Sequence, residues 1–137
     1  MMINVIVMTH GEFARGLINS VQMILGEQEN LTPLVFSPQM SLDSLVDKLE
    51  CKIQEFDNDN PTVLFVDLLG GSPSNAVAML LGRGVALSAV CGVNLPMLLE
   101  FLINRNTSRC DTLIKQAEET GKDGIVNIVE RFNEEKV

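Results

Sequence analysis

Apolar positions follow two patterns along this chain: short uninterrupted runs, and longer stretches in which apolar residues recur every three or four positions. Residues 3–8 form the first run and predict a strand that is covered on both faces of a sheet. Residues 12–25 follow with helical spacing, and their predicted apolar face consists of Phe13, Leu17, Val21 and Ile24. Gly26 is suited to end this helix because glycine readily adopts the left-handed conformation found there.

A second strand and helix follow in the same order. Residues 31–36 predict the strand, and Pro33 within it favours an edge position because proline has no N–H to donate to a neighbouring strand. Ser41 is expected to cap a helix that continues to Phe56, since a serine side chain can accept a hydrogen bond from the first helical turn.

The second half of the chain repeats this alternation. Residues 62–66 and 85–91 predict two more strands, and further helices are expected over 72 to about 81, 96–104 and 111–120. Ser72, which precedes a proline, predicts the N-cap of the first of these helices, and Gly121 is expected to end the last. Residues 125–129 are compatible with either a short strand or a helical turn.

The alternation predicts the α/β fold class, as a single domain over residues 1–137 with a mostly parallel, flavodoxin-like sheet. Helices are expected on both faces of the sheet, because parallel strands are joined by right-handed crossovers. In such folds ligands bind beyond the carboxyl ends of the strands. Chemistry is therefore expected where the first, third and fourth strands end.

Composition and charge narrow the classes of function. Apolar residues make up 46% of the chain, aromatic residues 4%, and the net charge is −8. Nucleic acid is excluded as a partner because its phosphates require clustered basic residues, whereas an acidic surface favours a protein with a basic patch. No segment approaches the roughly 20 apolar residues that cross a bilayer, and the N-terminus lacks the basic region of a signal peptide. A cytoplasmic protein is therefore expected.

The cysteine count fits the same compartment. The number is odd and the spacing is not that of metal ligands, so buried free thiols are expected at Cys51, Cys91 and Cys110.

The expected strand ends hold the only histidine, His10, together with Asp67 and the loop that leads to Ser72. Several familiar sites do not fit them. A P-loop would need lysine and a hydroxyl residue where Leu17 and Ile18 stand, and no G-x-G-x-x-G follows the first strand. A single histidine does not make a zinc site. No metal and no cofactor are expected.

His10 and Asp67 are suited to nucleophilic phosphoryl transfer if their strands are neighbours. A carboxylate bound to one ring nitrogen fixes the tautomer and leaves the other nitrogen its lone pair. Glycine lets the backbone approach a ligand closely, and a helix N-terminus favours an anion. We therefore expect His10 and Asp67 as catalytic residues, with a phosphate-binding set of Thr9, Gly70, Gly71 and Ser72. The same residues are also compatible with a structural histidine beside a tight turn and an N-cap.

At these residues the chain resembles the mannose-type IIA components, from the mannose, fructose and sorbose family, of the bacterial phosphoenolpyruvate-dependent sugar phosphotransferase system. The resemblance covers nearly the whole chain and depends on three stretches in the same order, I-V-M-T-H-G-E-F-A-R-G-L at 6–17, V-D-L-L-G-G-S-P-S-N-A at 66–76 and G-V-N-L-P-M-L-L-E at 92–100. T-H-G alone is unspecific, but the combination is specific. Leu69 departs from the pattern, because relatives carry an aromatic residue there, so the choice of partner is not inherited from the resemblance.

The resemblance implies a phosphocarrier without a cofactor. His10 would accept a phosphoryl group from the general phosphocarrier protein HPr and pass it to a IIB component, with Asp67 orienting the ring and Gly71 and Ser72 at the phosphoryl oxygens. The membrane components IIC and IID would take part only indirectly. The family forms homodimers by exchange of a C-terminal strand, for which residues 125–129 are the candidate. Because the chain ends soon afterwards, a stand-alone IIA component is expected.

Two alternatives remain open at this point. A regulatory binding module could keep the fold without transferring phosphate, and the phosphotransfer subunit of a dihydroxyacetone kinase shares the fold. The stretches at 66–76 and 92–100 fit the mannose type better than the kinase subunit. The resemblance implies that a IIA component does not contact the transported sugar, whose choice belongs to other components.

Overall fold

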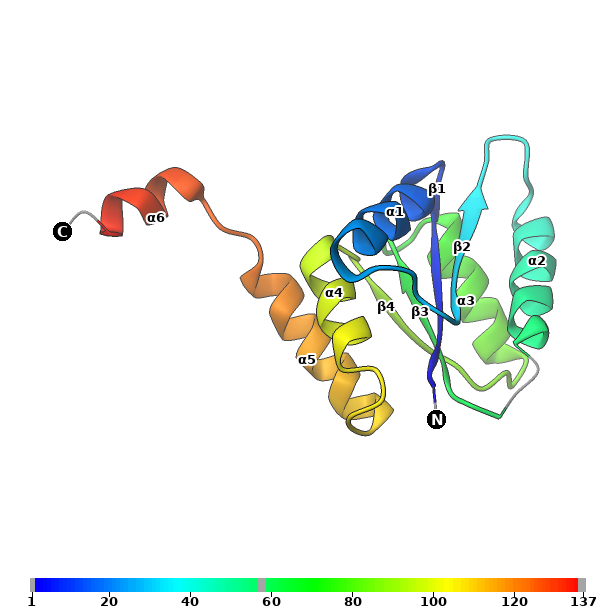
Figure 1. The fold of residues 1–137 in the computed structure, drawn as a ribbon. Coiled ribbons are helices and arrows are strands. Elements are labelled where there is room, and N and C mark those ends of the chain that lie inside the picture. The colour runs from blue at the N-terminus through cyan, green and yellow to red at the C-terminus, as the bar shows by residue number, and fades with distance from the viewer. Residues whose placement is uncertain (1, 57–58, 136–137) are drawn as a thin grey trace.

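A parallel sheet organises the part of the chain that the computed structural model describes, residues 2–56 and 59–135 (Figure 1). Its strands are β1 (Asn4–His10), β2 (Leu31–Phe36), β3 (Thr62–Val66) and β4 (Ser88–Cys91), and they lie in the order β2-β1-β3-β4. Every pairing among them is parallel. The predicted α/β class is confirmed, and β2 lies at an edge, as its proline indicated.

Helices cover both faces of this sheet. They are α1 (Phe13–Leu25), α2 (Leu42–Glu55), α3 (Ser72–Gly82), α4 (Leu95–Ile103), α5 (Cys110–Asp123) and α6 (Ile128–Glu135). One face is covered by α1, α4 and α5 and the other by α2 and α3 (Figure 1). The predicted caps of the first two helices are confirmed, since Gly26 ends α1 with φ +82° and the Ser41 Oγ accepts from Ser44 N–H at 3.1 Å.

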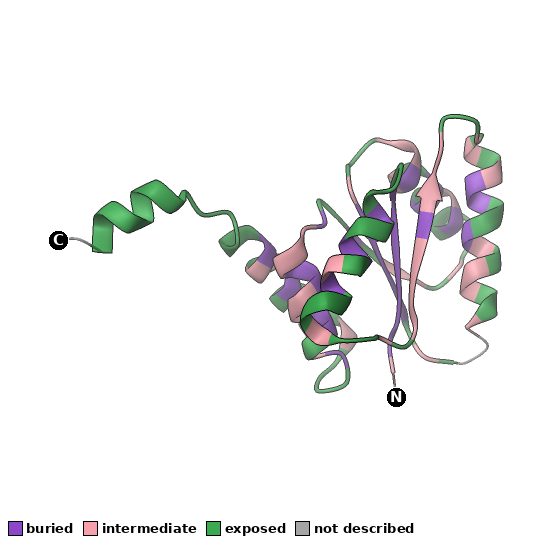
Figure 2. Cartoon of the chain, turned by 45° about the horizontal axis from the view of Figure 1, so that its top comes forward, coloured by how far each residue is buried: buried purple, intermediate pink, exposed green. Residues whose placement is uncertain are grey.

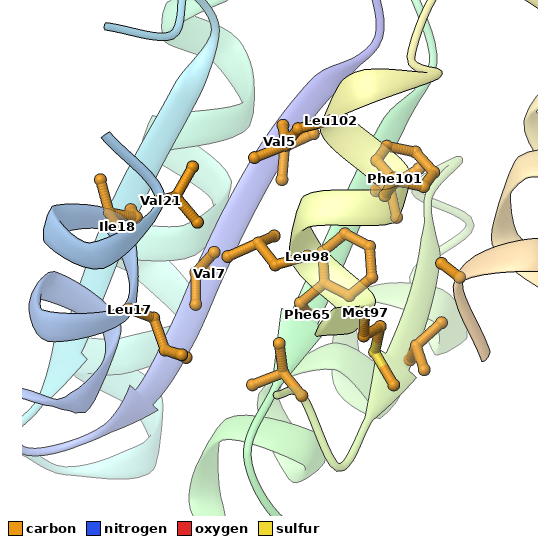
Figure 3. Packing of buried hydrophobic residues seen from close by; sticks show 14 of the residues in the cluster. Val5, Val7, Leu17, Ile18, Val21, Phe65, Met97, Leu98, Phe101 and Leu102 are labelled. Carbon is orange, nitrogen blue, oxygen red and sulfur yellow. The ribbon is translucent and has the colours of Figure 1, made fainter. Parts of the chain in front are cut away.

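Each face has its own apolar core, because alternate strand residues point to opposite sides of a sheet. On the first face, Val5, Val7 and Phe65 pack against α1 and α4 (Figure 3). Phe65 and Phe101 meet edge to face with their ring centroids 5.2 Å apart. On the second face, Ile6 and the strand residues beside it pack against α2 and α3. Burial on both sides explains why the β1 sequence is a continuous apolar run rather than an alternating one.

Packing against the sheet corrects two of the predicted elements. The buried side of α1 consists of Ala14, Leu17, Ile18 and Val21, whereas the predicted members Phe13 and Ile24 are exposed. The β4 strand is shorter than the predicted 85–91, because its pairing with β3 begins only at Ser88. The predicted helical period was therefore right, but only Leu17 and Val21 of the predicted apolar face meet the sheet.

Gly121 does not end α5, as predicted, but lies buried inside it. A Cβ at this position would lie 2.9 Å from Met97 Cε and 3.0 Å from Met97 Cβ, inside normal contact distance. The missing side chain lets α5 approach α4 closely. Packing between helices, and not chain termination, is therefore the reason for this glycine.

The prediction that the three cysteines are buried is wrong, since none of them is fully buried. All three are free, but Cys51 and Cys91 are exposed and Cys110 is partly buried. Cys51 lies on α2, beside a hollow between this helix and β2, and Cys91 is the last residue of the edge strand β4. Partial burial, with a smaller contribution from Asp111, raises the pKa of the Cys110 thiol.

The C-terminal segment extends away from the rest of the chain. Residues 125–127 form neither helix nor strand, and α6 follows them at a distance from the sheet (Figure 1). Of the α6 residues that the structure describes, none is buried (Figure 2). This segment nevertheless carries exposed apolar side chains at Ile125, Val126, Ile128, Val129 and Phe132.

A buried arginine joins three segments at the opposite end of the sheet from His10. Arg105 is only 4% exposed, and its Nη1 donates to the backbone oxygens of Ile3 at 3.2 Å and Asn30 at 3.1 Å. Its Nη2 donates to Gln28 Oε1 at 3.4 Å. Burial lowers the pKa of this guanidinium, and the nearby Glu29 acts in the opposite direction.

We expect Arg105→Met to lower the free energy of unfolding by about 2–3 kcal/mol, since buried carbonyl oxygens lose a charged donor. Arg109→Met is the matched control, because the Arg109 side chain is 84% exposed and pairs only at the surface. The control should change the free energy by less than about 0.5 kcal/mol. Urea denaturation measures both, and equal effects of the two substitutions would contradict the anchoring role of Arg105.

Candidate functional site

The site lies where the chain leaves neighbouring strands toward opposite faces of the sheet. His10 is the last residue of β1, and Asp67 directly follows β3. These strands pair in parallel, with Met8 opposite Val66, so both side chains emerge at the same edge. From there α1 covers one face and α3 the other (Figure 1). Such switch points are the usual ligand sites of open α/β sheets.

His10 and Asp67 are in direct contact, as expected if their strands were neighbours. His10 Nδ1 lies 2.9 Å from Asp67 Oδ2, and the backbone N–H of His10 donates to the same oxygen at 3.1 Å. A carboxylate can only accept, so Nδ1 carries the hydrogen and Nε2 of the neutral ring keeps its lone pair. The imidazole is 45% exposed and the Asp67 side chain 15%. The ring is therefore oriented by a mostly buried acid while remaining accessible.

The second oxygen of Asp67 has no comparable contact. Oδ1 is buried, and within the described residues it has no hydrogen-bond partner. A desolvated, unpaired carboxylate oxygen strengthens the electrostatic attraction between the acid and any positive charge on the ring. The Asp67 carboxylate thus directs its hydrogen bonds to His10 alone among these residues.

Gly71 lies against the opposite edge of the imidazole. A Cβ on this residue would lie 2.7 Å from His10 Cε1 and 3.2 Å from His10 Nε2. Any side chain here would push the ring away from Asp67 or cover its free nitrogen. Phe36, at the end of β2, also contacts the ring, edge to face with centroids 5.8 Å apart. The ring is held by contacts with three different segments.

The turn after β3 differs from the prediction in one detail. Gly71 is the N-cap of α3 and Ser72 its first residue, whereas Ser72 was predicted to be the cap. No side chain among the described residues caps this helix end. The extended backbone of Gly71 replaces the serine in this role because a side chain there would meet the ring. The N-terminus of α3 is thus not occupied by a capping side chain beside His10 Nε2.

Two predicted phosphate-binding groups are already engaged elsewhere. The Thr9 side chain is completely buried, and its hydroxyl accepts from Ala14 N–H at 2.7 Å and donates to the His10 carbonyl oxygen at 3.2 Å. The Gly70 N–H donates to Ser74 Oγ at 2.8 Å. The structure therefore does not bring the Thr9 hydroxyl or the Gly70 amide to the ring; of the predicted set it places Gly71 against the ring, with Ser72 next in the chain as the first residue of α3.

Two neighbours of the site were not singled out from the sequence. Ser74 contacts the turn through its hydroxyl, and Phe36 contacts the ring. Phe36 is the last residue of the edge strand β2 and pairs with His10, and its place at the end of a predicted strand was the sequence signal that could have identified it. The sequence signal for Ser74 was weaker, namely a hydroxyl residue in the first turn of the predicted helix.

The surroundings suit a large partner rather than an enclosed small molecule. The exposed apolar residues Phe13, Leu68 and Leu69 flank His10 and Asp67 in the sequence, and Leu69 is 78% exposed. A hollow of about 710 Å³ lies elsewhere, between β2 and α2. Over residues 2–56 and 59–135, no cluster of three His, Cys, Asp or Glu residues could hold a metal ion. In the same residues, no helix combines the length and apolarity needed to cross a membrane.

Comparison with known sequences identifies similar proteins over most of the chain. Residues 4–118 match the family described as "PTS system fructose IIA component". The mannose-specific EIIAB component of Escherichia coli K12 is 34% identical over 126 residues, which are 91% of this chain and 39% of that protein. The sorbose-specific EIIA component of Lacticaseibacillus casei is 36% identical over 110 residues, 80% of this chain and 79% of that one. The chain thus spans about two fifths of its Escherichia coli relative.

Solved structures show the same fold. A phosphotransferase system component EIIA from Streptococcus agalactiae superposes with a TM-score of 0.85 at 28% identity, covering 94% of this chain and 99% of that one. A mannose/sorbose specific IIA subunit from Enterococcus faecalis gives 0.83 at 29% identity, covering 93% and 96%. The similarity therefore extends from the sequence motifs to the whole arrangement of elements.

Proposed function

Because this chain belongs to the IIA components of the mannose, fructose and sorbose class of sugar phosphotransferase system, we propose that it carries a phosphoryl group on His10. The donor is phosphorylated HPr and the acceptor a IIB component, with the membrane components IIC and IID acting later. The observation that carries the proposal is the 2.9 Å contact between His10 Nδ1 and Asp67 Oδ2 at an open edge of the sheet. We propose that the protein performs this role in the cytoplasm.

The transfer step follows from the orientation of the ring. The lone pair of His10 Nε2 attacks phosphorus, the bond between phosphorus and the donor breaks, and its electron pair leaves with the donor. Because Nδ1 keeps its hydrogen, the phosphorylated ring gains positive charge. Asp67 lies on the far side of the ring from the phosphoryl group, so it stabilises that charge without repelling the phosphoryl oxygens.

The phosphoryl oxygens are proposed to lie at Gly71 and Ser72, beside Nε2. Backbone N–H groups at the start of a helix of this length attract anions, by about 0.3–1 kcal/mol and up to about 2 kcal/mol when partly buried. Gly70 contributes by its turn conformation, φ +88°, rather than by its engaged amide. The Thr9 hydroxyl supports the backbone of His10 and is not part of this set.

The experiment that tests the proposal is phosphorylation in a reconstituted relay. Incubation with phosphoenolpyruvate, Enzyme I and HPr should give a protein-bound phosphate that is labile in acid and stable in base, as phosphoramidates are. Omitting HPr should abolish the label. A folded protein that takes no label while a known IIA component in the same mixture is labelled would contradict the proposal.

Failure to label would favour the alternative of a regulatory binding module. The contact between His10 and Asp67 argues against that alternative, since binding alone does not require an oriented, accessible imidazole. The matched relatives carry the names of mannose- and sorbose-specific components, which favours a sugar system over a dihydroxyacetone kinase.

We also propose a homodimer that covers the C-terminal segment. Its apolar side chains include Ile125, 81% exposed, and Ile128, 80% exposed, and they stand apart from both cores (Figure 2). A second copy offers a complementary edge, since β4 ends the sheet with β3 as its neighbour on one side. Pairing of residues 125–127, which are neither helix nor strand, along the β4 edge of the second copy would satisfy backbone groups, and the contact would bury the apolar side chains of α6.

The dimer is expected to have twice the chain mass of 15.0 kDa in sedimentation equilibrium. Replacing Ile128 and Val129 by aspartate together should give a monomer, because charges would have to be buried at the contact. The matched control replaces Met23 and Ile24, which are similarly exposed on α1, and should stay dimeric. A wild-type monomer at high concentration would contradict the dimer.

A further inference from the structure

The turn from Asp67 to Ser72 needs support from within, because little of it is packed. Leu68, Leu69 and Gly70 are exposed, and Gly70 has a left-handed backbone, φ +88°. An exposed turn of this kind loses conformational entropy when it adopts one shape. A stabilising interaction is therefore needed to hold the turn in the conformation in which Gly71 meets the His10 ring.

A single hydroxyl joins the two glycines of the turn. Ser74 Oγ accepts from the Gly70 N–H at 2.8 Å and donates to the Gly71 carbonyl oxygen at 3.0 Å. The same carbonyl accepts from Asn75 N–H at 2.9 Å, which is the first hydrogen bond of the helix. A hydroxyl can donate and accept at once, which an alanine or an apolar side chain cannot do. The side chain of Ser74 therefore ties the turn to the first turn of α3.

The backbone of the Asp67–Ser72 turn also determines the space beside His10 Nε2. The Gly71 backbone lies so close to His10 Cε1 and Nε2 that a Cβ would clash with the ring. A shift of Gly71 away from the ring would open this space, and a shift toward it would displace the imidazole from Asp67. The Ser74 hydroxyl, which contacts Gly71 and not the ring, acts on His10 through this glycine.

We propose that Ser74 is a positioning residue for phosphoryl transfer. Its hydroxyl holds the Gly70–Gly71 turn against the His10 ring, beside Nε2. This inference presupposes the proposed function, that His10 carries the phosphoryl group. Ser74 forms no bond to phosphorus and gains no charge. Its contribution is to keep the Gly71 and Ser72 amides in place as the phosphoryl group arrives.

The test compares Ser74→Ala with Ser74→Thr, which keeps a hydroxyl. Ser41→Ala is the matched control, because it also removes a serine oxygen that accepts a backbone N–H, but at the N-terminus of α2. Rapid-quench kinetics with phosphorylated HPr measure transfer, and NMR hydrogen exchange measures protection of the Gly70 amide. We expect Ser74→Ala to slow transfer about 10-fold, since small displacements of reacting groups have effects of this size or larger. Ser74→Thr should restore both the rate and the Gly70 protection, and Ser41→Ala should change neither.

Three outcomes would overturn the positioning role of Ser74. They are transfer at the wild-type rate in Ser74→Ala, equal slowing in Ser41→Ala, and recovery of Gly70 protection in Ser74→Thr without recovery of the rate. If the wild-type protein takes no phosphate, the proposed function fails, and the positioning role is then judged by the NMR signal of the His10 Cε1–H. That signal should move in Ser74→Ala and not in Ser41→Ala, and an unmoved signal would overturn the inference.

Discussion

The His10→Gln variant is expected to take no acid-labile phosphate from phosphorylated HPr. His10 is the only histidine of the chain, so its replacement removes every imidazole nucleophile. Glutamine keeps a polar side chain at a half-exposed position, and the free energy of unfolding should change by no more than about 1 kcal/mol. Gel electrophoresis with radioactive phosphoenolpyruvate measures the label, and thermal unfolding confirms that the variant is folded.

A second variant tests whether position as well as residue type is required. Gln22 is exposed on α1, so Gln22→His can be added to the His10→Gln protein without disturbing a core. This double variant has a histidine but no partner carboxylate or helix N-terminus arranged around it, and it should stay unlabelled. Acid-labile phosphate in His10→Gln would refute His10 as the acceptor, and label in the double variant alone would show that the arrangement around His10 is not required.

Asp67→Asn is expected to slow phosphoryl transfer by about 10- to 100-fold. The substitution removes the charge that stabilises the phosphorylated ring, and hydrogen bonds to charged groups contribute about 1.5–3 kcal/mol. Each 1.36 kcal/mol of barrier corresponds to a tenfold change in rate. Asparagine can also present its amide N–H to Nδ1, which would move the ring hydrogen to Nε2 and block attack. Rapid-quench kinetics at fixed pH and salt measure the effect.

The control for Asp67→Asn is Asp111→Asn, which makes the same charge change at the exposed start of α5. It should leave the transfer rate within about twofold, because exposed charges at a distance are screened by salt. If the two substitutions slow transfer equally, the effect belongs to the net charge of the protein and Asp67 does not orient the ring.

The arrangement also accounts for the identity of residue 71. Asp67 holds the ring on its Nδ1 side and Gly71 lies at Nε2, so the imidazole is confined between a carboxylate and a backbone without a side chain. In the proposed transfer, an incoming phosphoryl group would meet the N-terminus of α3 at the same place. The orientation of the His10 ring and the access to its Nε2 thus depend on residues at the ends of two neighbouring strands.

Much of this site could be expected from local sequence patterns. Continuous apolar runs mark strands that are buried on both faces, and the order of strands and helices restricts the connections to right-handed crossovers. Asp67 directly follows such a run and His10 comes two residues after one, so their place at one edge of the sheet could be predicted. Their contact required in addition that β1 and β3 pair, which the crossover rules allow but do not dictate.

The errors have a common origin in packing. The period of α1 does not reveal that Ala14 and Ile18, and not Phe13, face the sheet. Gly121 resembles a helix terminator until Met97 is found against it. Thr9 resembles a ligand-binding hydroxyl until its contact with Ala14 N–H is seen. Each of these three features depends on a neighbouring residue from another segment or on the direction in which a side chain points, and neither can be read from local sequence.

By itself, the sequence determined the α/β class, the order of the strands and helices from β1 to α5, and the last residues of β2, β3 and β4, because these follow from short-range periodicity and backbone preferences. Only the tertiary structure decided that Asp67 Oδ2 lies 2.9 Å from His10 Nδ1, that Gly71 faces the other side of the ring, and that Ser74 holds the turn between them. These contacts join residues from separate elements, and their distances are set by how the helices pack on the sheet rather than by any local pattern.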